Sequence, residues 1–116
     1  MRLRFQFGEN SFVAELFSNP ASDQLARMMP LELTIEDYAH NEKIAYLPQK
    51  LAEVEANPFS GEAIGDICYY APWGNTVFYY DHYRYSRGLI RLGRIEGNVR
   101  PMLTRGTFPL RAELLS

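Results

Sequence analysis

Short stretches in which polar and apolar residues alternate recur along most of the chain, with glycine- or proline-containing turns between them. The first is residues 2–7, Arg-Leu-Arg-Phe-Gln-Phe. Such alternation has the period of a β-strand with one buried face. Seven prolines and eight glycines interrupt the chain, which limits most elements to a few residues. The sequence is therefore constrained to a fold made of many short strands.

This pattern predicts seven or eight strands and one clear helix. Asn19 followed by Pro20 is typical of a helix start, and Pro30 ends the helix. The polar run 37–43 is expected to be a loop, and residues 49–64 are expected to form a long excursion of the kind that often carries function. The strands are expected at residues 2–7, 12–17, 31–36, 44–47, 67–71, 76–80, 89–95 and 107–114.

Length and composition place this pattern in one globular domain. The chain has 116 residues, of which 47% are hydrophobic and 22% are charged, values typical of a folded domain spanning residues 1–116. So many strands favour an all-β sandwich or closed barrel with one or two short helices, and closure is favoured because it leaves no exposed sheet edge.

Several classes of protein are disfavoured. No apolar run approaches the roughly 20 residues of a membrane span, and the start lacks the apolar core of a secretory signal, so no membrane partner is expected. Cys68 is the only cysteine and has no internal disulfide partner, which fits a cytoplasmic location. His40 and His82 are far from it in sequence, so neither a metal site nor a cofactor is expected.

Charge is unevenly distributed along the chain. Residues 1–81 carry a net charge of −7 and residues 82–116 carry +5, and every base in the second segment is arginine. The arginines could form an anion-binding or nucleic-acid face, or they could pair with the acidic segment. Pairing is favoured, and nucleic acid is not an expected partner, because the pI of about 5.7 is far below that of basic nucleic-acid-binding domains.

Three segments, in order along the chain, resemble cyclophilins. Residues 15–20, Glu-Leu-Phe-Ser-Asn-Pro, resemble the entry from a strand into a short helix in that family, residues 65–79 resemble a strand and its returning partner, and residues 92–97 resemble the Phe-Gly-Lys-Val-x-x-Gly segment. Residues 41–43 and 47–48 are further similar to small prokaryotic cyclophilin-like proteins, a family of unknown function. The resemblance implies a closed cyclophilin-like β-barrel of about eight strands.

The cyclophilin resemblance does not carry over the catalytic residues. The Phe-His-Arg stretch of true cyclophilins has no counterpart here, and the nearest base is Lys43, a point donor that cannot replace a guanidinium fork. Tyr83, Tyr85 and Leu89 occupy the segment where cyclophilins place a tryptophan and a histidine. Whether the protein is an enzyme stays open, and a divergent peptidyl-prolyl isomerase is one alternative, because that reaction needs only an apolar cradle and a donor.

Aromatic residues concentrate between positions 69 and 85, where tyrosines, Trp73 and Phe78 interleave. They are either ordinary packing or an apolar pocket that carries a few polar groups. We expect a groove that binds a small molecule or an extended peptide; an alternative is that the aromatic patch is a homodimer interface. The residues expected to line the groove are Tyr46, Tyr70, Trp73, Phe78, Tyr80 and Tyr85, with Lys43 and Asn75 as polar anchors.

For the other side chains that could carry chemistry, a structural or solvent-exposed role is favoured. Glu42 and Lys43 are either a solvated loop pair, which is favoured, or an acid and a donor at the pocket mouth. His82 is expected on the surface, since its neighbour Asp81 points to the opposite side of a strand and cannot orient it. Cys68 is expected to be a buried, unreactive thiol.

Overall fold

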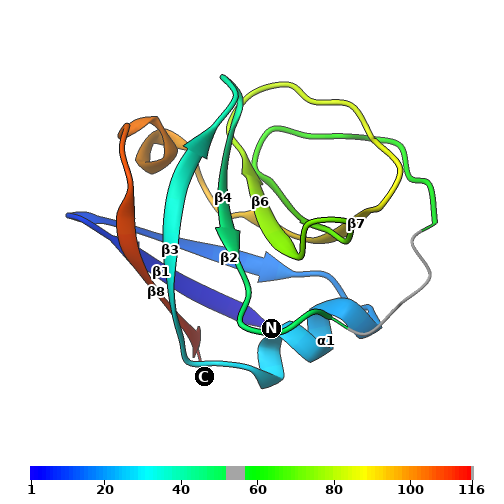
Figure 1. Cartoon of the computed structure of the whole chain (residues 1–116), viewed down its shortest axis with the longest axis horizontal. Coiled ribbons are helices and arrows are strands. Elements are labelled where there is room, and N and C mark those ends of the chain that lie inside the picture. The colour runs from blue at the N-terminus through cyan, green and yellow to red at the C-terminus, as the bar shows by residue number, and fades with distance from the viewer. Residues whose placement is uncertain (52–56, 116) are drawn as a thin grey trace.

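The computed structural model describes residues 1–51 and 57–115, and Figure 1 shows them as strands that curve around a common core. The strands are β1 (Arg2–Phe7), β2 (Asn10–Leu16), β3 (Leu31–Tyr38), β4 (Glu42–Tyr46), β5 (Asp66–Tyr70), β6 (Asn75–Tyr79), β7 (Leu89–Ile95) and β8 (Phe108–Leu115). One α-helix, α1 (Pro20–Arg27), and one short 3₁₀ helix, η1 (Arg100–Leu103), complete the described elements. No helix in these ranges has the length and apolar character needed to cross a membrane.

The eight strands form a closed antiparallel barrel in the order β1-β2-β7-β5-β6-β4-β3-β8, with β8 paired back to β1. Every strand therefore has a partner on both sides, which removes the unpaired edges that favour aggregation. The predicted all-β closed barrel with short helices is confirmed.

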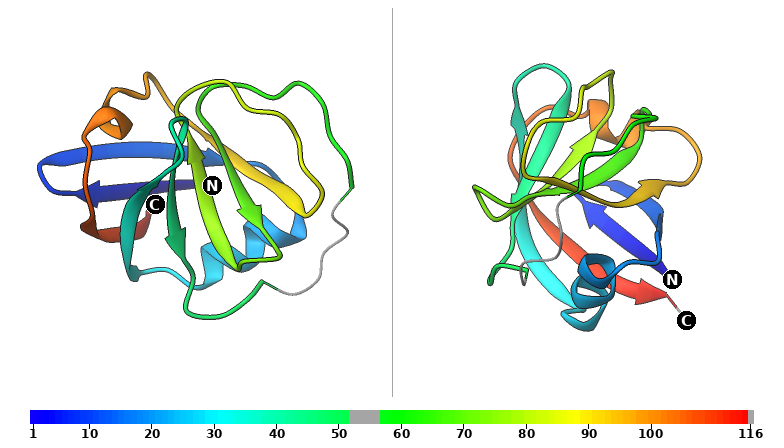
Figure 2. Two further views of the ribbon diagram at one scale, coloured as in Figure 1. Left: turned by 45° about the horizontal axis from the view of Figure 1, so that its top comes forward. Right: turned by 90° about the vertical axis from the view of Figure 1, so that its right-hand side faces the viewer.

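Helix α1 covers one end of the barrel (Figure 2). As predicted, Asn19 caps it, and its side chain accepts a hydrogen bond from the backbone amide of Ser22. The Ser22 hydroxyl donates to the carbonyl of Leu92 at 2.6 Å, and Leu25 is buried in the core. The helix thus closes the barrel with apolar side chains and one buried hydrogen bond to β7.

The predicted loop at residues 37–43 is wrong. Strand β3 runs to Tyr38 and β4 begins at Glu42, with only a tight turn between them, and Asp37 pairs in register with Lys43. The strands can continue through this polar stretch because Asp37 and Lys43 form an ion pair with each other. The long excursion predicted at 49–64 falls partly on residues 52–56, which lie outside the described residues.

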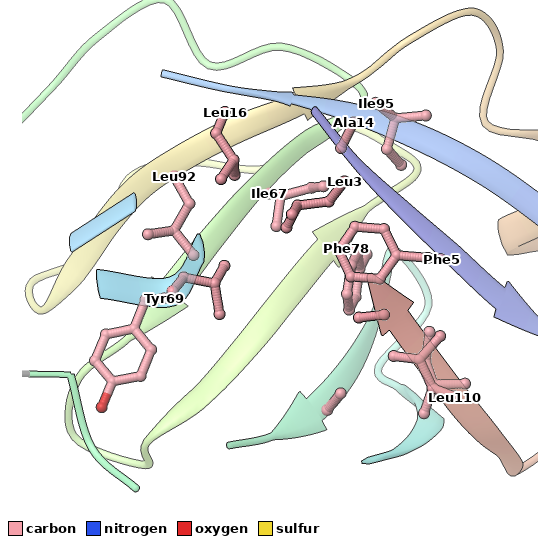
Figure 3. Packing of buried hydrophobic residues seen from close by; sticks show 14 of the residues in the cluster. Leu3, Phe5, Ala14, Leu16, Ile67, Tyr69, Phe78, Leu92, Ile95 and Leu110 are labelled. Carbon is pink, nitrogen blue, oxygen red and sulfur yellow. The ribbon is translucent and has the colours of Figure 1, made fainter. Parts of the chain in front are cut away.

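The barrel interior is filled by apolar side chains that alternate along each strand (Figure 3). Phe5 lies at its centre, stacked on Phe12 at 5.0 Å between ring centroids and edge-on to Phe78 at 5.3 Å. Each such ring removes roughly 150–250 Å² from water. Aromatic and aliphatic side chains on the inner face are therefore the main source of stability.

A second, smaller apolar cluster lies on the outer face of the barrel. It comprises Ile44, Cys68, Val77, Tyr79 and Leu89, and its partly buried cover comprises Phe59, Tyr70, Tyr83 and Tyr85. The cover comes partly from residues 57–65 and 80–88, which run beside one another over this part of the barrel (Figures 1 and 2). Strands β4, β6 and β5 are therefore buried on both faces, unlike the rest of the sheet.

Candidate functional site

Three rows of side chains cross the outer face of strands β4, β6 and β5. The register pairs Glu42 with Tyr79, Ile44 with Val77, and Tyr46 with Asn75, while β5 adds Cys68 and Tyr70 to the second and third rows. Side chains two residues apart on a strand share a face, so these rows form one continuous surface. The first and third rows are four residues apart, or about 13 Å along the strands.

A hollow of about 270 Å³ lies over this surface, between the strands and the segments that cover them. Ile44, Val77 and Leu89 give it an apolar floor, while Glu42 and Asn75 supply polar groups from the first and third rows. We call this hollow the outer groove. Its lining residues are Tyr38, Glu42, Ile44, Tyr70, Trp73, Asn75, Val77, Tyr79, Ser86 and Leu89.

Asn75 is a fully buried side chain, and neither its Nδ2 nor its Oδ1 atom has a hydrogen-bond partner among the residues that the structure describes. The neighbouring side chain, Thr76, is also buried but points to the inner face, where its hydroxyl donates to the carbonyl of Ala45 at 2.9 Å. A buried amide that lacks partners costs about 1–3 kcal/mol, and such groups in folded proteins usually have a partner. The outer groove therefore contains an unused set of donors and an acceptor.

Glu42 is half-buried in the first row, and its side chain forms no ion pair or hydrogen bond with the residues that the structure describes. Burial raises the pKa of its carboxyl group to about 7. Lys43 does not neutralise it, because adjacent residues on a strand point to opposite faces. The outer groove thus holds one carboxyl group that changes charge near neutral pH.

The rim of the outer groove is aromatic. The Trp73 ring lies edge-to-face with Tyr38 at 5.2 Å and with Tyr70 at 5.4 Å between centroids. Trp73 is 45% exposed and Tyr38 is 44% exposed, although rings of this size usually bury most of their surface. Tyr38 pairs with Glu42 in the first row, whereas Trp73 follows the third row in the turn after β5, so their contact joins the two ends of the groove.

A polar network around the buried Asp66 lies next to the groove residue Tyr79. Asp66 accepts hydrogen bonds from the Tyr83 hydroxyl at 2.6 Å and from Nε of Arg94 at 2.7 Å. The Tyr83 ring stacks on Tyr79 at 3.7 Å between centroids. Burial and the hydrogen bond to Asp66 raise the pKa of Tyr83, so it stays neutral. The network ties Tyr83, in the segment that follows β6, to Asp66 on β5 and to the ring of Tyr79.

A sequence profile of the cyclophilin-like family matches residues 5–113. The chain belongs to the cyclophilin-like family. The predicted resemblance is thereby confirmed for nearly the whole length of the barrel. None of the curated proteins matches the chain significantly.

A solved structure shows the same cyclophilin-like barrel. It is the solution structure of a hypothetical protein from Archaeoglobus fulgidus, with a TM-score of 0.73 and 19% sequence identity over 97% of this chain and 93% of that one. At this identity the similarity shows the fold alone. The fold assignment of this cyclophilin-like protein thus has support from both sequence and structure.

Three of the predicted groove residues lie together in the outer groove, namely Tyr70, Trp73 and Asn75. Tyr85 lies close by in the cover of the outer cluster, where its ring packs edge-on against Phe59 at 4.9 Å. Tyr46 is on the outer face of β4 but lines a different hollow.

The structure places the other three predicted groove residues away from the outer groove. Phe78 lies in the core of the barrel, and Tyr80 packs partly against that core while its hydroxyl accepts from Arg105. Phe78 and Tyr80 are the immediate neighbours of Tyr79 in the sequence. Because successive side chains of a strand point to opposite faces, they point inward where Tyr79 points outward.

Lys43, the expected polar anchor, is 0% exposed and points into the barrel. Its Nζ donates to Asp37 at 2.7 Å and lies 5.7 Å from the centre of the Phe7 ring. Burial acts to raise the pKa of Asp37, but hydrogen bonds from Lys43 and the Gly106 amide, and the charges of Lys43 and Arg105, outweigh it and hold the pKa below its usual value. Lys43 is thus neither a solvated loop residue nor a groove residue.

The predicted pairing of the arginine-rich segment with the acidic one is confirmed. Arg91 and Arg94 pair with Asp66, while Arg105 pairs with Asp37. Arg111 similarly pairs with Glu32. The uneven charge along the sequence thus reflects contacts across the barrel.

The placements predicted for Cys68 and His82 agree with the structure. Cys68 is buried, and burial raises the pKa of its thiol to about 12. His82 is exposed, with its backbone amide bonded to Asp81. Within the described ranges, no group of three or more His, Cys, Asp or Glu side chains is arranged to hold a metal ion.

The sequence interpretation gave Glu42 a place at the pocket mouth only as the less favoured alternative. The lining residues that it missed are Tyr38, Ile44, Val77, Tyr79, Ser86 and Leu89. The signal that could have identified these residues is the register of β4. Once β4 is taken to begin at Glu42, alternation places Glu42, Ile44 and Tyr46 on one face and Lys43 on the other.

A larger and more open hollow of about 550 Å³ lies over β1, β8 and the start of β3, with Tyr46 at its margin. Its charged side chains Arg111 and Glu32 pair with each other at 3.1 Å. It contains no buried side chain without a partner among the residues described, so the smaller outer groove is the stronger candidate site.

Proposed function

We propose that this protein binds a small molecule in the outer groove. The observation that carries the proposal is Asn75, a buried amide that lines the hollow and whose donors and acceptor are unused within the described part of the chain. Ligand sites are typically apolar pockets with a few polar groups that fix orientation. Glu42 and Asn75 fit that role, because they are two rows apart on the surface that lines the groove.

The size of the groove supports a small ligand over a long peptide. Its volume of about 270 Å³ is slightly below the roughly 300–1,000 Å³ of pockets that enclose drug-sized molecules. An extended peptide would place only one side chain in such a hollow. Affinity is then expected to come from a compact group that fills the floor and bonds Asn75.

Binding is favoured over proline isomerisation by the polar groups present. Isomerase activity would need a donor aimed at a peptide carbonyl, and among the residues described the groove lining contains no lysine or arginine side chain. In the place of such a cationic donor, the groove offers the neutral side-chain amide of Asn75. A protease-coupled assay on Xaa-Pro peptides separates the two functions, because the binding proposal expects the uncatalysed rate for every peptide.

The direct test is a screen of small polar fragments against the wild type, read by Trp73 fluorescence and by thermal shift. Trp73 is the only tryptophan, so its emission reports on the groove rim. Asn75→Leu removes the unused amide at similar volume and should abolish the response. Thr34→Ala, in the larger hollow, should leave it unchanged.

Two outcomes would contradict the proposal. Either no fragment produces a saturable response, or fragments bind equally well to the wild type and to Asn75→Leu. The mass of the protein should be measured by sedimentation over the same concentration range, because a homodimer that covers Trp73 would also hide the groove from fragments.

A further inference from the structure

The outer groove combines one carboxyl group with several aromatic rings. Glu42 lies directly between Tyr38 on β3 and Tyr79 on β6 in the sheet. Residues directly opposite on paired strands have Cβ atoms about 4.5–5.5 Å apart. Glu42 therefore has a tyrosine beside it on each neighbouring strand, and the Trp73 indole contacts Tyr38 from the rim.

The described structure supplies no positive charge to this carboxyl group. From β3 the titratable neighbours are Tyr38 and the half-buried Glu36, which pairs with Ile44 one row away. From β6 and β5 they are Tyr79 and Cys68, both of which have their pKa raised mainly by burial and further by the charge of Glu42. Lys43 is on the inner face and is already paired with Asp37.

A carboxylate beside aromatic faces is the chemistry that recognises an organic cation. The π-faces of tyrosine and tryptophan attract alkylammonium groups, most strongly when the site is partly shielded from water. The carboxylate adds a direct charge partner that bulk solvent only partly screens. A neutral or anionic ligand would gain neither interaction at this end of the groove.

We propose that the ligand of the outer groove is a small organic cation whose alkylammonium group binds between Glu42 and the rings of Tyr38, Tyr79 and Trp73. A hydroxyl or amide of the same molecule pairs with Asn75. This inference rests on the proposed function, since it names the ligand class of that same groove. Because Glu42 must be ionised for the pairing, affinity rises with pH through neutrality.

The test uses pairs of ligands that differ only in charge. Choline and its neutral isostere dimethylbutanol represent a free small molecule, while acetyl-trimethyllysine methylamide and its uncharged carbon analogue represent a side chain carried by a peptide. Binding is measured by calorimetry and by Trp73 fluorescence. We expect at least one cation to bind at least about tenfold more tightly than its neutral partner, and the better pair identifies the source.

Variants assign the effect to Glu42. Glu42→Gln keeps the shape and should weaken cation binding about tenfold while leaving the neutral partner unchanged. Glu9→Gln, an exposed change in a distant turn, should leave both unchanged. In the wild type, cation binding should strengthen from about pH 6 to about pH 8, and in Glu42→Gln it should not.

Failure of this inference is distinguishable from failure of the proposed function. Equal binding of charged and neutral partners, or cation binding that survives Glu42→Gln, overturns the cation inference and leaves a groove for neutral ligands. No binding of any cation also overturns it, and the fragment screen with Asn75→Leu then decides whether the groove binds anything.

Discussion

Removing the charge of Asp37 should destabilise the barrel more than removing that of Lys43, although the two form one ion pair. Lys43 is 0% exposed, and among the described residues its carboxylate partner is Asp37 at 2.7 Å. Asp37→Asn leaves a buried ammonium without a counter-charge, which costs about 3–5 kcal/mol. Lys43→Met leaves a carboxylate that is 16% exposed and keeps the Gly106 amide and Arg105, so the cost is about 1–2 kcal/mol.

The assay is urea unfolding at neutral pH, followed by far-ultraviolet circular dichroism. The double variant Asp37→Asn, Lys43→Met should be more stable than Asp37→Asn alone, because the isolated buried charge is gone. Arg111→Gln, which breaks the exposed pair with Glu32, is the control and should cost less than about 1 kcal/mol. The reasoning would be refuted if the two single variants lost equal free energy of unfolding. It would also be refuted if the loss in the double variant equalled the sum of the two single losses.

Three further predictions concern stability. Asn75→Leu should raise the free energy of unfolding by about 1–3 kcal/mol, whereas Thr76→Val, which loses a made hydrogen bond, should lower it by about 1 kcal/mol; chemical denaturation of both variants checks the contrast. Gly93→Ala should cost at least about 3 kcal/mol, because its Cβ would lie 2.3 Å from the carbonyl of Glu15, while Gly97→Ala, which meets nothing within 4 Å, should cost about 1–2 kcal/mol. The pKa of Glu42 is raised to about 7 in the folded protein, so the protonated carboxyl group adds to the free energy of unfolding below about pH 4.3, and this stabilisation is lost as the pH rises to about 7. Urea unfolding across this pH range should show that loss in the wild type and not in Glu42→Gln.

Much of the barrel could be predicted from the sequence because its strands alternate. The hairpin of β1 and β2, the cap at Asn19 and the pairing of late arginines with early acids all follow from local pattern or charge distribution. Alternation alone does not distinguish a closed barrel from a sandwich. Closure was predicted because it leaves no exposed sheet edge and because the family resemblance implies it.

The candidate site was harder to predict because it depends on the face that each residue of β4 and β6 presents. An aromatic run such as Phe78-Tyr79-Tyr80 is apolar on both faces, so its composition does not reveal which ring points outward. Lys43 is an exception of another kind, since a charged side chain is expected in solvent unless a partner is known. The sequence pattern puts that partner, Asp37, in the same predicted loop as Lys43, residues 37–43, so the pairing across two strands is not visible from it.

The account depends most on the outer groove being the binding site. The most direct measurement is a proton–nitrogen correlation spectrum of the labelled protein, recorded during titration with choline and with the pooled polar fragments. We expect the largest shifts at the Trp73 indole and the Asn75 side-chain amide, because both line the groove. Shifts confined to the larger hollow near Leu33 and Tyr46, or no shifts with any ligand, would contradict the account.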